Sequence, residues 1–335
     1  MSTSKASAEA TAVSAPANRS FGSRAKTHYK KWWWVHLIVI IIVLLVVLLP
    51  VVYVGYPKIA QTDVNESTLN ITSMVISDPT PDSFHLTQTQ VIGSHASFHP
   101  QIFAFSASVS LLGAAAPFAS VQVPAVQSKD GAVVDISQTL SLSDVSAFGD
   151  YAKAVMLNEE VDLNIYGKPV LQEGALPKTT VTYNKTVTMK GLNKLKGFNV
   201  TEFNILGTQP DGTNMNGTVL IPNPSVLTLA MGNLTLDLSV AGQPMGQSYL
   251  KNLVLKPGNN TIPMTSKVDD AAIIKLLEGG NKYSSGIIPF DITGNSSVYN
   301  GQNLPYFTAA LAANTLTVEL NVGKALGLSS GTSSS

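Results

Sequence analysis

The sequence has no cysteine and few charged side chains. Among its 335 residues, Asp, Glu, Lys and Arg together make up 13%, about half of the ~25% usual in soluble domains. The absence of cysteine excludes a disulfide framework, a Cys-ligated zinc or iron–sulfur site, and thiol catalysis. The length allows two modest domains or one large one, at roughly 100–200 residues per domain.

The few charges are unevenly distributed, although the formal net charge is zero. Residues 1–31 hold six basic side chains against one acid, Glu9, and the rest of the chain carries the compensating excess of acids. Such a chain should not be interpreted as one soluble unit. It has no glycine-rich phosphate loop, and the part after residue 31 is acidic. Nucleotide and nucleic-acid binding therefore have no support.

A charge-free apolar run extends over residues 37–54. As a helix it spans about 27 Å, and its flanking residues extend it toward the ~30 Å of a bilayer core. Trp32–Trp34 precede the run, and Tyr53 and Tyr56 mark its other end, as aromatic residues do at membrane interfaces. No small-residue cleavage site is present, so we predict a transmembrane signal anchor over 32–56. A buried core helix, the alternative, needs neither the three tryptophans nor a basic flank.

The basic flank predicts the orientation of this helix. Three lysines lie just before the apolar run, whereas only Lys58 lies just after it, where Asp63 and Glu66 offset its charge. The positive-inside rule places the N-terminus in the cytosol and residues 57–335 in a lumen or outside the cell. Residues 1–31 are predicted to be a disordered basic cytosolic tail. Its basic side chains either attract anionic lipid headgroups or, the preferred interpretation, only set the topology.

Eight Asn-x-Ser/Thr sequons follow the predicted anchor, which agrees with a glycosylated lumenal domain. An Asn-, Ser- and Thr-rich composition also produces such sequons by chance. Asn18 begins another sequon, which the predicted topology makes silent. The glycosylation candidates are Asn65, Asn70, Asn184, Asn199, Asn216, Asn233, Asn259 and Asn295.

The part after the anchor contains an internal repeat. Five short matches occur in the same order at offsets of 127 to 129 residues, among them residues 161–167 with 288–294. We predict one domain over 57–190 and a second over 198–325. The segment 191–197 is the predicted linker, and 326–335 is a Ser/Gly-rich tail.

Each copy is predicted to be mostly strand. Residues 227–240 have β-rich composition, with Gly232-Asn233 as a turn, and residues 315–322 alternate apolar and polar side chains. Residues 179–189 are the counterpart of this last strand in the first copy.

One short helix is predicted at the same place in each copy. In the first copy Ser141 and Asp144 precede it; in the second, Ser266 and Asp269 suit its N-terminus and Gly279-Gly280 its end. The expected fold is mainly β, with an N-terminal transmembrane helix followed by two tandem β-sandwiches, each with one short helix.

The second copy resembles the LEA-2 type domain. The resemblance rests on an Asn-Pro-Ser after the first long strand, a Gly-x-x-x-Gly turn region, and a Leu-x-Pro-Gly-x-Asn before the next strand. The residues concerned are Asn223, Pro224, Ser225, Gly242, Gly246, Pro257 and Gly258. In the first copy residues 94–97, Ser-His-Ala-Ser, stand where Asn-Pro-Ser does in the second.

With its anchor and tandem copies, the chain is similar to a fungal family of single-pass vacuolar membrane proteins with LEA-2 type, DUF3712-like lumenal domains. The resemblance implies fibronectin-like sandwiches without established catalytic residues. It also implies a role in regulating autophagy at the vacuole and a groove that holds lipid.

Three groups of side chains are candidates for reactive sites. Gly327-Leu328-Ser329-Ser330-Gly331 matches the hydrolase motif Gly-x-Ser-x-Gly, but it lies in the tail and no histidine follows it. His95 and His99 are four residues apart, so on a strand they would lie ~13 Å from each other. This is too far for both to bind one metal ion unless a turn brings them together. The acidic residues lie at predicted helix starts and strand ends, which favours a structural role over a catalytic pair of carboxylates. The histidines are His85, His95 and His99, and the acids are Glu159, Glu160, Asp162, Asp269 and Asp270.

We therefore predict no catalytic, cofactor-binding or metal-binding residue, and a protein that is not an enzyme. The preferred hypothesis is a vacuolar or other endomembrane protein whose lumenal sandwiches bind lipid or a protein partner. The alternative is a glycosylated adhesion or scaffold module at the cell surface or wall. A lumenal hydrolase, the third class, needs Ser, His and acid side chains to converge in a cleft.

Overall fold

The computed structural model describes residues 21–94, 96, 98–278 and 282–326. The chain divides into two compact units, residues 1–56 and 57–335. The first contains α1 (Phe21–Pro50) and a π-helical turn, η1 (Val51–Gly55). The helical stretch that begins at Trp32 is apolar and exposed, and it is long enough to cross a membrane. This helix agrees with the predicted anchor over 32–56.

The second unit is mainly β, as predicted; over the chain, 50% of residues lie in strands and 24% in helices. We call residues 57–190 the first half and residues 198–326 the second half. The first half contains α2 (Tyr56–Glu66), β1 (Thr68–Ser77), β2 (Ser83–Gly93), β3 (Gln101–Ile102), β4 (Phe105–Leu111), β5 (Ala119–Val123), β6 (Val126–Gln127), β7 (Ala132–Ser141), α3 (Val145–Leu157), β8 (Glu160–Gly167), β9 (Val170–Gln172), β10 (Thr179–Thr180) and β11 (Tyr183–Lys190).

After a 3-10 turn, η2 (Asn193–Leu195), the second half follows. It contains β12 (Asn199–Ile205), β13 (Met215–Asn223), β14 (Leu227–Val240), β15 (Gln243–Leu255), β16 (Gly258–Val268), α4 (Asp270–Leu277), β17 (Ile287–Tyr299), β18 (Gln302–Asn303), α5 (Pro305–Ala312), β19 (Thr315–Asn321) and α6 (Val322–Ala325).

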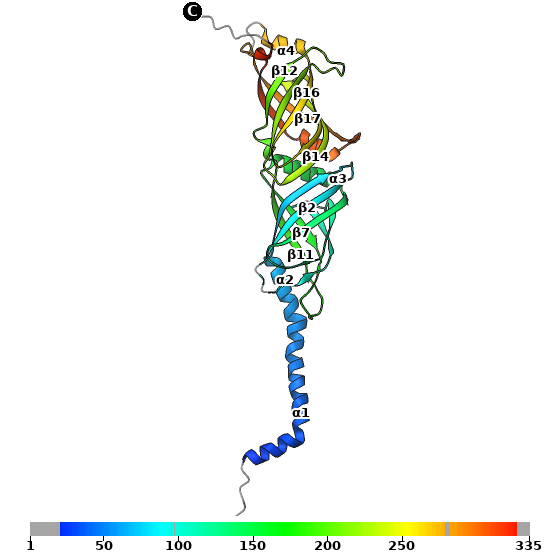
Figure 1. The fold of residues 1–335 in the computed structure, drawn as a ribbon, viewed down its shortest axis with the longest axis vertical. Coiled ribbons are helices and arrows are strands. Elements are labelled where there is room, and N and C mark those ends of the chain that lie inside the picture. Colours follow the sequence, from blue (N-terminus) through cyan, green and yellow to red (C-terminus); the bar gives the residue numbers. More distant parts are fainter. Residues whose placement is uncertain (1–20, 95, 97, 279–281, 327–335) are drawn as a thin grey trace, which may run out of the picture. The chain divides into compact units, whose positions relative to one another are not determined.

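The same strand pairings occur in both halves. In the first half one layer has the strand order β1-β2-β7 and the other has the order β5-β4-β8-β11. In the second half the layer β12-β13-β16 corresponds to the first of these, and the layer β15-β14-β17-β19 corresponds to the second. The helix also follows the third strand of the first layer in each half, α3 after β7 and α4 after β16. The internal repeat seen in the sequence is therefore a repeat of topology, and the halves are sandwich-like (Figure 1).

The two halves differ in how their layers are joined. In the second half β15 pairs with β16 from Gly246 to Tyr249, so that hydrogen bonds connect the layers. In the first half the corresponding strands, β5 and β7, are joined by a backbone bridge from Ala119 to Leu142, just beyond β7. The side chain of Gln138 on β7 also bonds to the backbone of Gln122 on β5, accepting from its N–H at 3.1 Å and donating to its carbonyl at 3.0 Å. The layers are therefore tied along this edge in both halves, by a backbone ladder in the second and by one bridge and a glutamine side chain in the first.

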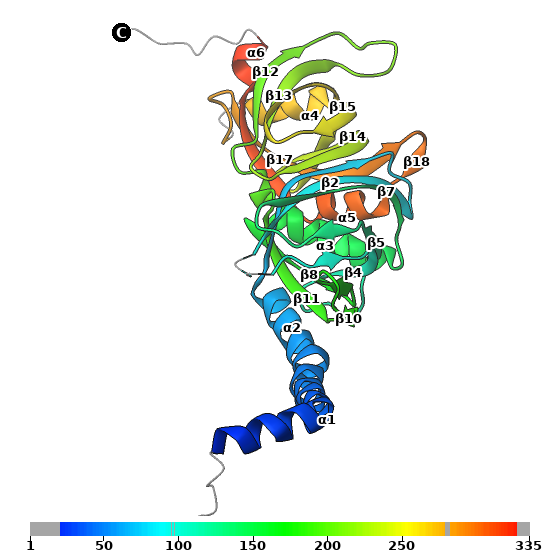
Figure 2. The same cartoon turned by 60° about the horizontal axis from the view of Figure 1, so that its bottom comes forward.

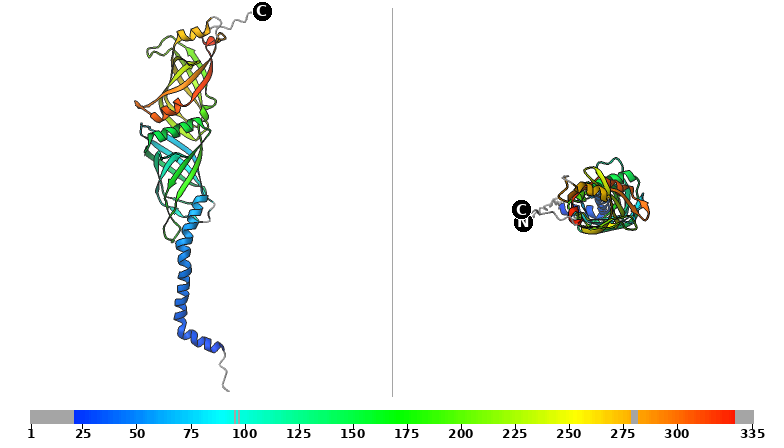
Figure 3. Two further views of the ribbon diagram at one scale, coloured as in Figure 1. Left: turned by 180° about the vertical axis from the view of Figure 1, so that it is seen from behind. Right: turned by 90° about the horizontal axis from the view of Figure 1, so that it is seen from above.

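Two contacts join the halves into one unit. The start of β14 pairs in parallel with β1, with Met74 opposite Leu227 and Ile76 opposite Leu229. In addition α3 packs against α5 between the two halves (Figure 2), an arrangement that is also visible from behind (Figure 3). The division into domains at 191–197 stays a prediction, since residues 57–335 form one compact unit.

Helix α3 forms because its apolar residues repeat at helical spacing behind a good cap. The carboxylate of Asp144 accepts a hydrogen bond from the backbone N–H of Ala147 at 2.9 Å. Phe148 and Tyr151 lie on the buried face, which meets the aromatic residues of α5. The ring centroids of Phe148 and Tyr306 are 4.9 Å apart in an edge-to-face arrangement, and the Tyr306 hydroxyl donates to the carbonyl of Thr80 at 2.8 Å.

Three details of the sequence interpretation differ from the structure. The segment 191–197 is packed, with Leu192 and Leu195 buried. Gly232 does not form a turn; β14 continues through it with a bulge, where Gly232 has φ +72° and an added Cβ would lie 2.3 Å from the carbonyl oxygen of Val298. Helix α5 was not foreseen, because its short apolar sequence is as typical of a buried strand as of a helix.

We expect Phe148→Ala to destabilise the second unit by about 3–5 kcal/mol, because the ring packs against aromatic residues from both halves. Val133→Ala, at an exposed position on β7, is the control and should change stability by less than about 0.5 kcal/mol. Urea unfolding followed by far-UV circular dichroism measures both, since the three tryptophans lie in the apolar helix. Equal effects of the two substitutions would contradict the assigned role of Phe148.

Candidate functional site

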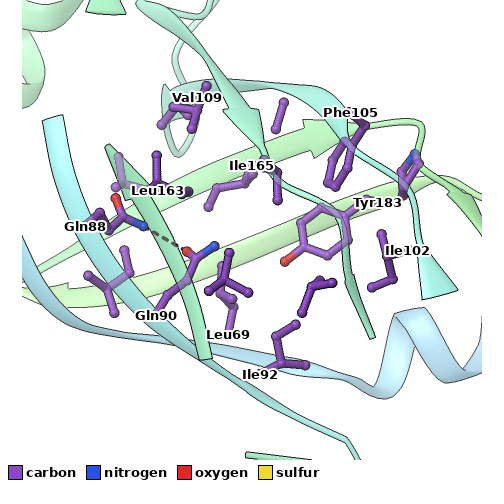
Figure 4. Close-up of a pocket in the computed structure, with 18 of the residues that line it drawn as sticks. Leu69, Gln88, Gln90, Ile92, Ile102, Phe105, Val109, Leu163, Ile165 and Tyr183 are labelled. Carbon is purple, nitrogen blue, oxygen red and sulfur yellow. Dashed lines mark hydrogen bonds between the residues drawn. The ribbon is translucent and has the colours of Figure 1, made fainter. Parts of the chain in front are cut away.

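The interior of the first half contains a cavity of about 120 Å³ between its two layers. Aliphatic and aromatic side chains from β1, β2, β4, β7 and β8 form most of its wall. Figure 4 shows part of this wall, including Leu163 and Ile165. Phe148 and Tyr151 of α3 line the cavity at the end near α5. Among the described residues, no Lys, Arg or His lines it, and Asp63 is the one acid that does. The cavity therefore suits an uncharged, largely apolar guest.

Helix α2 lies at the opposite end of this cavity and is fixed there by polar contacts. Its Ala60 and Val64 are part of the cavity wall. The side-chain amide of Gln61 donates to the carbonyl of Thr182 at 2.8 Å and accepts from the N–H of Thr182 at 2.7 Å. Lys185 of β11 donates to the carbonyl oxygens that end the helix, and desolvation lowers its pKa. These bonds hold α2 beside the cavity.

Two glutamines of β2 are buried in this apolar wall. Gln88 is 7% exposed and Gln90 is 5% exposed. The Nε2 of Gln88 donates to the Oε1 of Gln90 at 2.8 Å, and neither side chain has another hydrogen bond in the described part of the chain. Because a carboxamide offers two donors and a carbonyl acceptor, the pair keeps a free acceptor and free donors beside the cavity. Because these free atoms border the cavity and are not fully enclosed by protein, a guest in the cavity can reach them.

Tyr183 of β11 brings a third polar group to the cavity from the other layer. Its ring lies 6.0 Å from that of Phe105, centroid to centroid, and burial raises the pKa of Tyr183 to about 12. Its hydroxyl makes no hydrogen bond within the described residues, whereas the hydroxyls of Tyr151 and Tyr306 donate to Met189 and to a carbonyl. Figure 4 shows Tyr183 and the Gln88–Gln90 pair lining the same space.

The second half contains another apolar cavity, of about 200 Å³, beneath α4 and α6. Its polar lining groups already have partners in the protein. The hydroxyl of Ser248 is 2.7 Å from that of Ser266, and Asp270 accepts from the Nδ2 of Asn214 at 2.9 Å. The face of β13 that corresponds to the glutamine face of β2 presents no glutamine. The two cavities thus differ in the hydrogen-bonding capacity that they leave free.

The side chains of all eight predicted glycosylation sites are exposed. They are distributed over both halves, on strands and on α2, and five of them make side-chain hydrogen bonds. Asn295, for example, donates from Nδ2 to Asp237 at 2.8 Å. All eight asparagines are therefore exposed, and their glycosylation stays a prediction.

The residues that carry the LEA-2 resemblance form turns. Asn223, at the end of β13, is buried and donates from Nδ2 to the carbonyl of Leu227 at 2.8 Å, while its Oδ1 accepts from Ser225. Pro224 lies exposed between them, and Pro257 is exposed before β16. Gly242, Gly246 and Gly258 all have positive φ. With the exception of Gly246, these residues shape the connections between strands. Gly246 lies within β15, where an added Cβ would lie 2.1 Å from the carbonyl oxygen of Lys267.

The histidines and acids do not assemble into a reactive group in the described residues. His85 contacts hydroxyl groups of β7, and His99 contacts the carbonyl of Ser128. His95 and the Gly-x-Ser-x-Gly segment lie outside the described residues, as does the Gly279-Gly280 helix stop. Where the structure describes the chain, no three His, Asp or Glu side chains are placed to hold a metal ion.

The acids expected at helix starts and strand ends have those structural positions. Asp269, which was expected as a first-turn acid, is the N-cap of α4, and Asp270 lies in the first turn. Ser266 instead lies within β16, where it bonds to Ser248. Glu159 and Glu160 are exposed, and Asp162 accepts from Thr188 at 2.6 Å.

The sequence interpretation missed the glutamines and Tyr183, although the signal for the glutamines was present. On β2 every second residue faces inward, and Gln88 and Gln90 continue the apolar series that begins with Phe84 and Leu86. Two glutamines on the apolar face of an alternating strand are the pattern that marks this site.

Comparison with known families gives one partial match. Residues 116–238 match the family model described as DUF3712, a protein of unknown function. The match supports a protein that contains a DUF3712 region. This segment runs from before β5 through most of β14, so it includes part of the cavity wall, Tyr183 and the Asn-Pro-Ser turn. No curated protein matches the chain.

Two solved structures show weak similarity to the chain. The periplasmic chaperone SfaE is 11% identical, with 75% of this chain and 98% of the chaperone covered and a TM-score of 0.15. The CupB6 tip adhesin of Pseudomonas aeruginosa is 8% identical, with 71% and 98% covered and a TM-score of 0.18. Similarities this weak carry no argument about the chain.

We expect the hydroxyl of Tyr183 to make stability depend on pH only in alkali. The unfolded chain ionises this group near pH 10, and the folded chain keeps its proton until about pH 12. Its contribution to the free energy of unfolding is therefore complete below pH 10 and is lost as the pH rises through 12. The stability difference between wild type and Tyr183→Phe, measured by urea unfolding, should be constant below pH 10 and fall above it. A constant difference up to pH 12 would mean that the hydroxyl faces water.

We expect endoglycosidase treatment to increase the electrophoretic mobility of the protein, because the eight sequons are exposed and are predicted to face a lumen. Asn→Gln substitutions at single sequons should each remove at most one glycan, while Asn18→Gln should change nothing. Glycosylation at Asn18 and at none of the eight would reverse the predicted orientation.

Proposed function

We propose that this chain is a non-enzymatic single-pass membrane protein, with its N-terminus in the cytosol, whose lumenal sandwiches bind lipid. The cavity of the first half is the observation that carries the proposal. Its wall is almost wholly apolar, and burying each methylene of a guest there contributes about 0.8 kcal/mol.

The position of the cavity along the chain supports a lipid guest. Ala60 of α2 lines it, and Ala60 lies only six positions after Val54, the last residue of the apolar run. Six residues span at most about 20 Å. The chain therefore keeps Ala60 within that distance of the end of the proposed membrane segment, which supports a guest taken from the bilayer.

The resemblance to vacuolar single-pass proteins supports the vacuole or another endomembrane as the location, and a role in autophagy regulation as the context of lipid binding. The exposed sequons favour a second candidate, a glycosylated adhesion or scaffold module at the cell surface or wall. A fluorescent tag on the cytosolic tail separates the two. Signal at the vacuolar rim supports the first candidate, and signal confined to the plasma membrane supports the second.

We expect Val109→Phe to weaken lipid binding roughly tenfold, because the larger ring displaces about two methylenes of the guest from the cavity. The matched control is Val200→Phe, since Val200 is a half-buried strand residue that lines the cavity of the second half. Binding is measured with full-length protein in amphipol, by the fluorescence of N-phenyl-1-naphthylamine and its displacement by 1-monooleoylglycerol.

Three comparisons complete this test. Amphipol without protein gives the blank, and thermal unfolding verifies that each variant is folded. Selective loss in Val109→Phe assigns binding to the first half, whereas equal binding by both variants and the wild type would contradict the proposed site. Fluorescence no higher than the blank would contradict the proposed function.

A further inference from the structure

The cavity of the first half has hydrogen-bonding capacity that a purely hydrocarbon guest would leave unused. Gln88 and Gln90 satisfy only one donor and one acceptor between them, at 2.8 Å. The hydroxyl of Tyr183 has no partner in the described part of the chain. The polar atoms of these three side chains border the cavity and are not among the fully buried side-chain atoms without a partner, so a guest in the cavity can use the hydrogen-bonding capacity that they leave free.

We infer that the Gln88–Gln90 pair and Tyr183 bind the polar linkage of a neutral lipid, namely an acyl ester with an adjacent hydroxyl group, as in a monoacylglycerol. The inference rests on the proposed lipid-binding function. The amide N–H groups and the tyrosine hydroxyl supply donors for a carbonyl oxygen, and the free glutamine carbonyl accepts from a hydroxyl. The part of the acyl chain next to the ester then occupies the aliphatic remainder of the cavity, since about 120 Å³ is well below the roughly 300–1,000 Å³ of pockets that enclose a whole drug-sized ligand.

The charges around the cavity favour a neutral guest over a fatty-acid carboxylate. Among the described lining residues there is no cation to pair with a carboxylate, and Asp63 at the α2 end would repel one. Burial and the neighbouring Glu66 raise the pKa of Asp63, so negative charge is already disfavoured at this end. The nearest side-chain cation of β11, Lys185, donates to backbone carbonyls of Asn65 and Ser67.

The second half supplies the internal comparison. Its cavity is larger, at about 200 Å³ against about 120 Å³, yet its polar groups bond to each other. Free polar groups are therefore not a general consequence of this sandwich architecture. They are specific to the cavity beside α2.

The test uses full-length protein in amphipol with N-phenyl-1-naphthylamine as the reporter. Three competitors share an eighteen-carbon chain: 1-monooleoylglycerol, oleate at pH 8, and 1-octadecene. The double variant Gln88→Met/Gln90→Met keeps side-chain volume and removes both amides, and Tyr183→Phe removes one hydroxyl. Gln243→Met, at an exposed position on β15, is the control.

The wild type should bind monooleoylglycerol more tightly than oleate or octadecene. We expect the double variant to lose about tenfold in affinity for monooleoylglycerol, and Tyr183→Phe about fivefold, with octadecene binding unchanged. The control should behave as the wild type. Equal affinity of wild type and both variants for monooleoylglycerol would overturn the inference and leave the proposed lipid binding in place.

Two further results separate the inference from its alternatives. If no competitor displaces the reporter from the wild type, the proposed function and the inference both fail. If the glutamines serve folding alone, the double variant will melt at a lower temperature than the wild type; a site made for a ligand predicts an equal or higher melting temperature without ligand. Tyr183→Phe, which removes only one oxygen, keeps the test decisive if the double variant does not fold.

Discussion

The packing of α3 against α5 is the interaction on which the rest of the second unit depends. Phe148 stands between the two helices, where its ring meets Tyr306 on one side and Phe84 and Phe118 on the other. The same residue lines the end wall of the cavity in the first half. One aromatic cluster therefore joins the halves and closes one end of the space between the layers, which leaves α2 at the other end.

The repeat explains why one topology carries two different interiors. Both halves use the same strand order, but in the second half β15–β16 hydrogen bonds tie the layers together and the polar groups of its cavity bond to each other. In the first half the corresponding edge is joined by one backbone bridge and by the side chain of Gln138, and the inward face of β2 carries two glutamines. The duplicated scaffold thus carries two interiors that differ in the polar groups they leave free, and the proposed guest binding rests on this difference.

Much of this architecture could be predicted from local sequence. The charge-free run over 37–54, the helices that follow Asp144 and Asp269, and the alternation of 315–322 each carry their structural signal within a few residues. The parallel pairing of β1 with β14 could not be predicted, because it joins residues about 150 positions apart that have no shared pattern. Gly232 looked like a turn, since the contact with Val298 that fixes it in a bulge is also distant. The polar groups of the cavity were missed for a different reason: the alternation of β2 places Gln88 and Gln90 on its apolar face, but only the fold shows that this face lines a cavity.

The measurement that tests lipid binding most directly is native mass spectrometry of the full-length protein released from its own membrane, followed by organic extraction of whatever it retains. The account predicts one neutral, ester-linked lipid per chain, retained after the micelle is stripped and reduced in Val109→Phe. A folded protein that leaves the membrane as bare polypeptide would contradict it and would turn the search toward a protein partner.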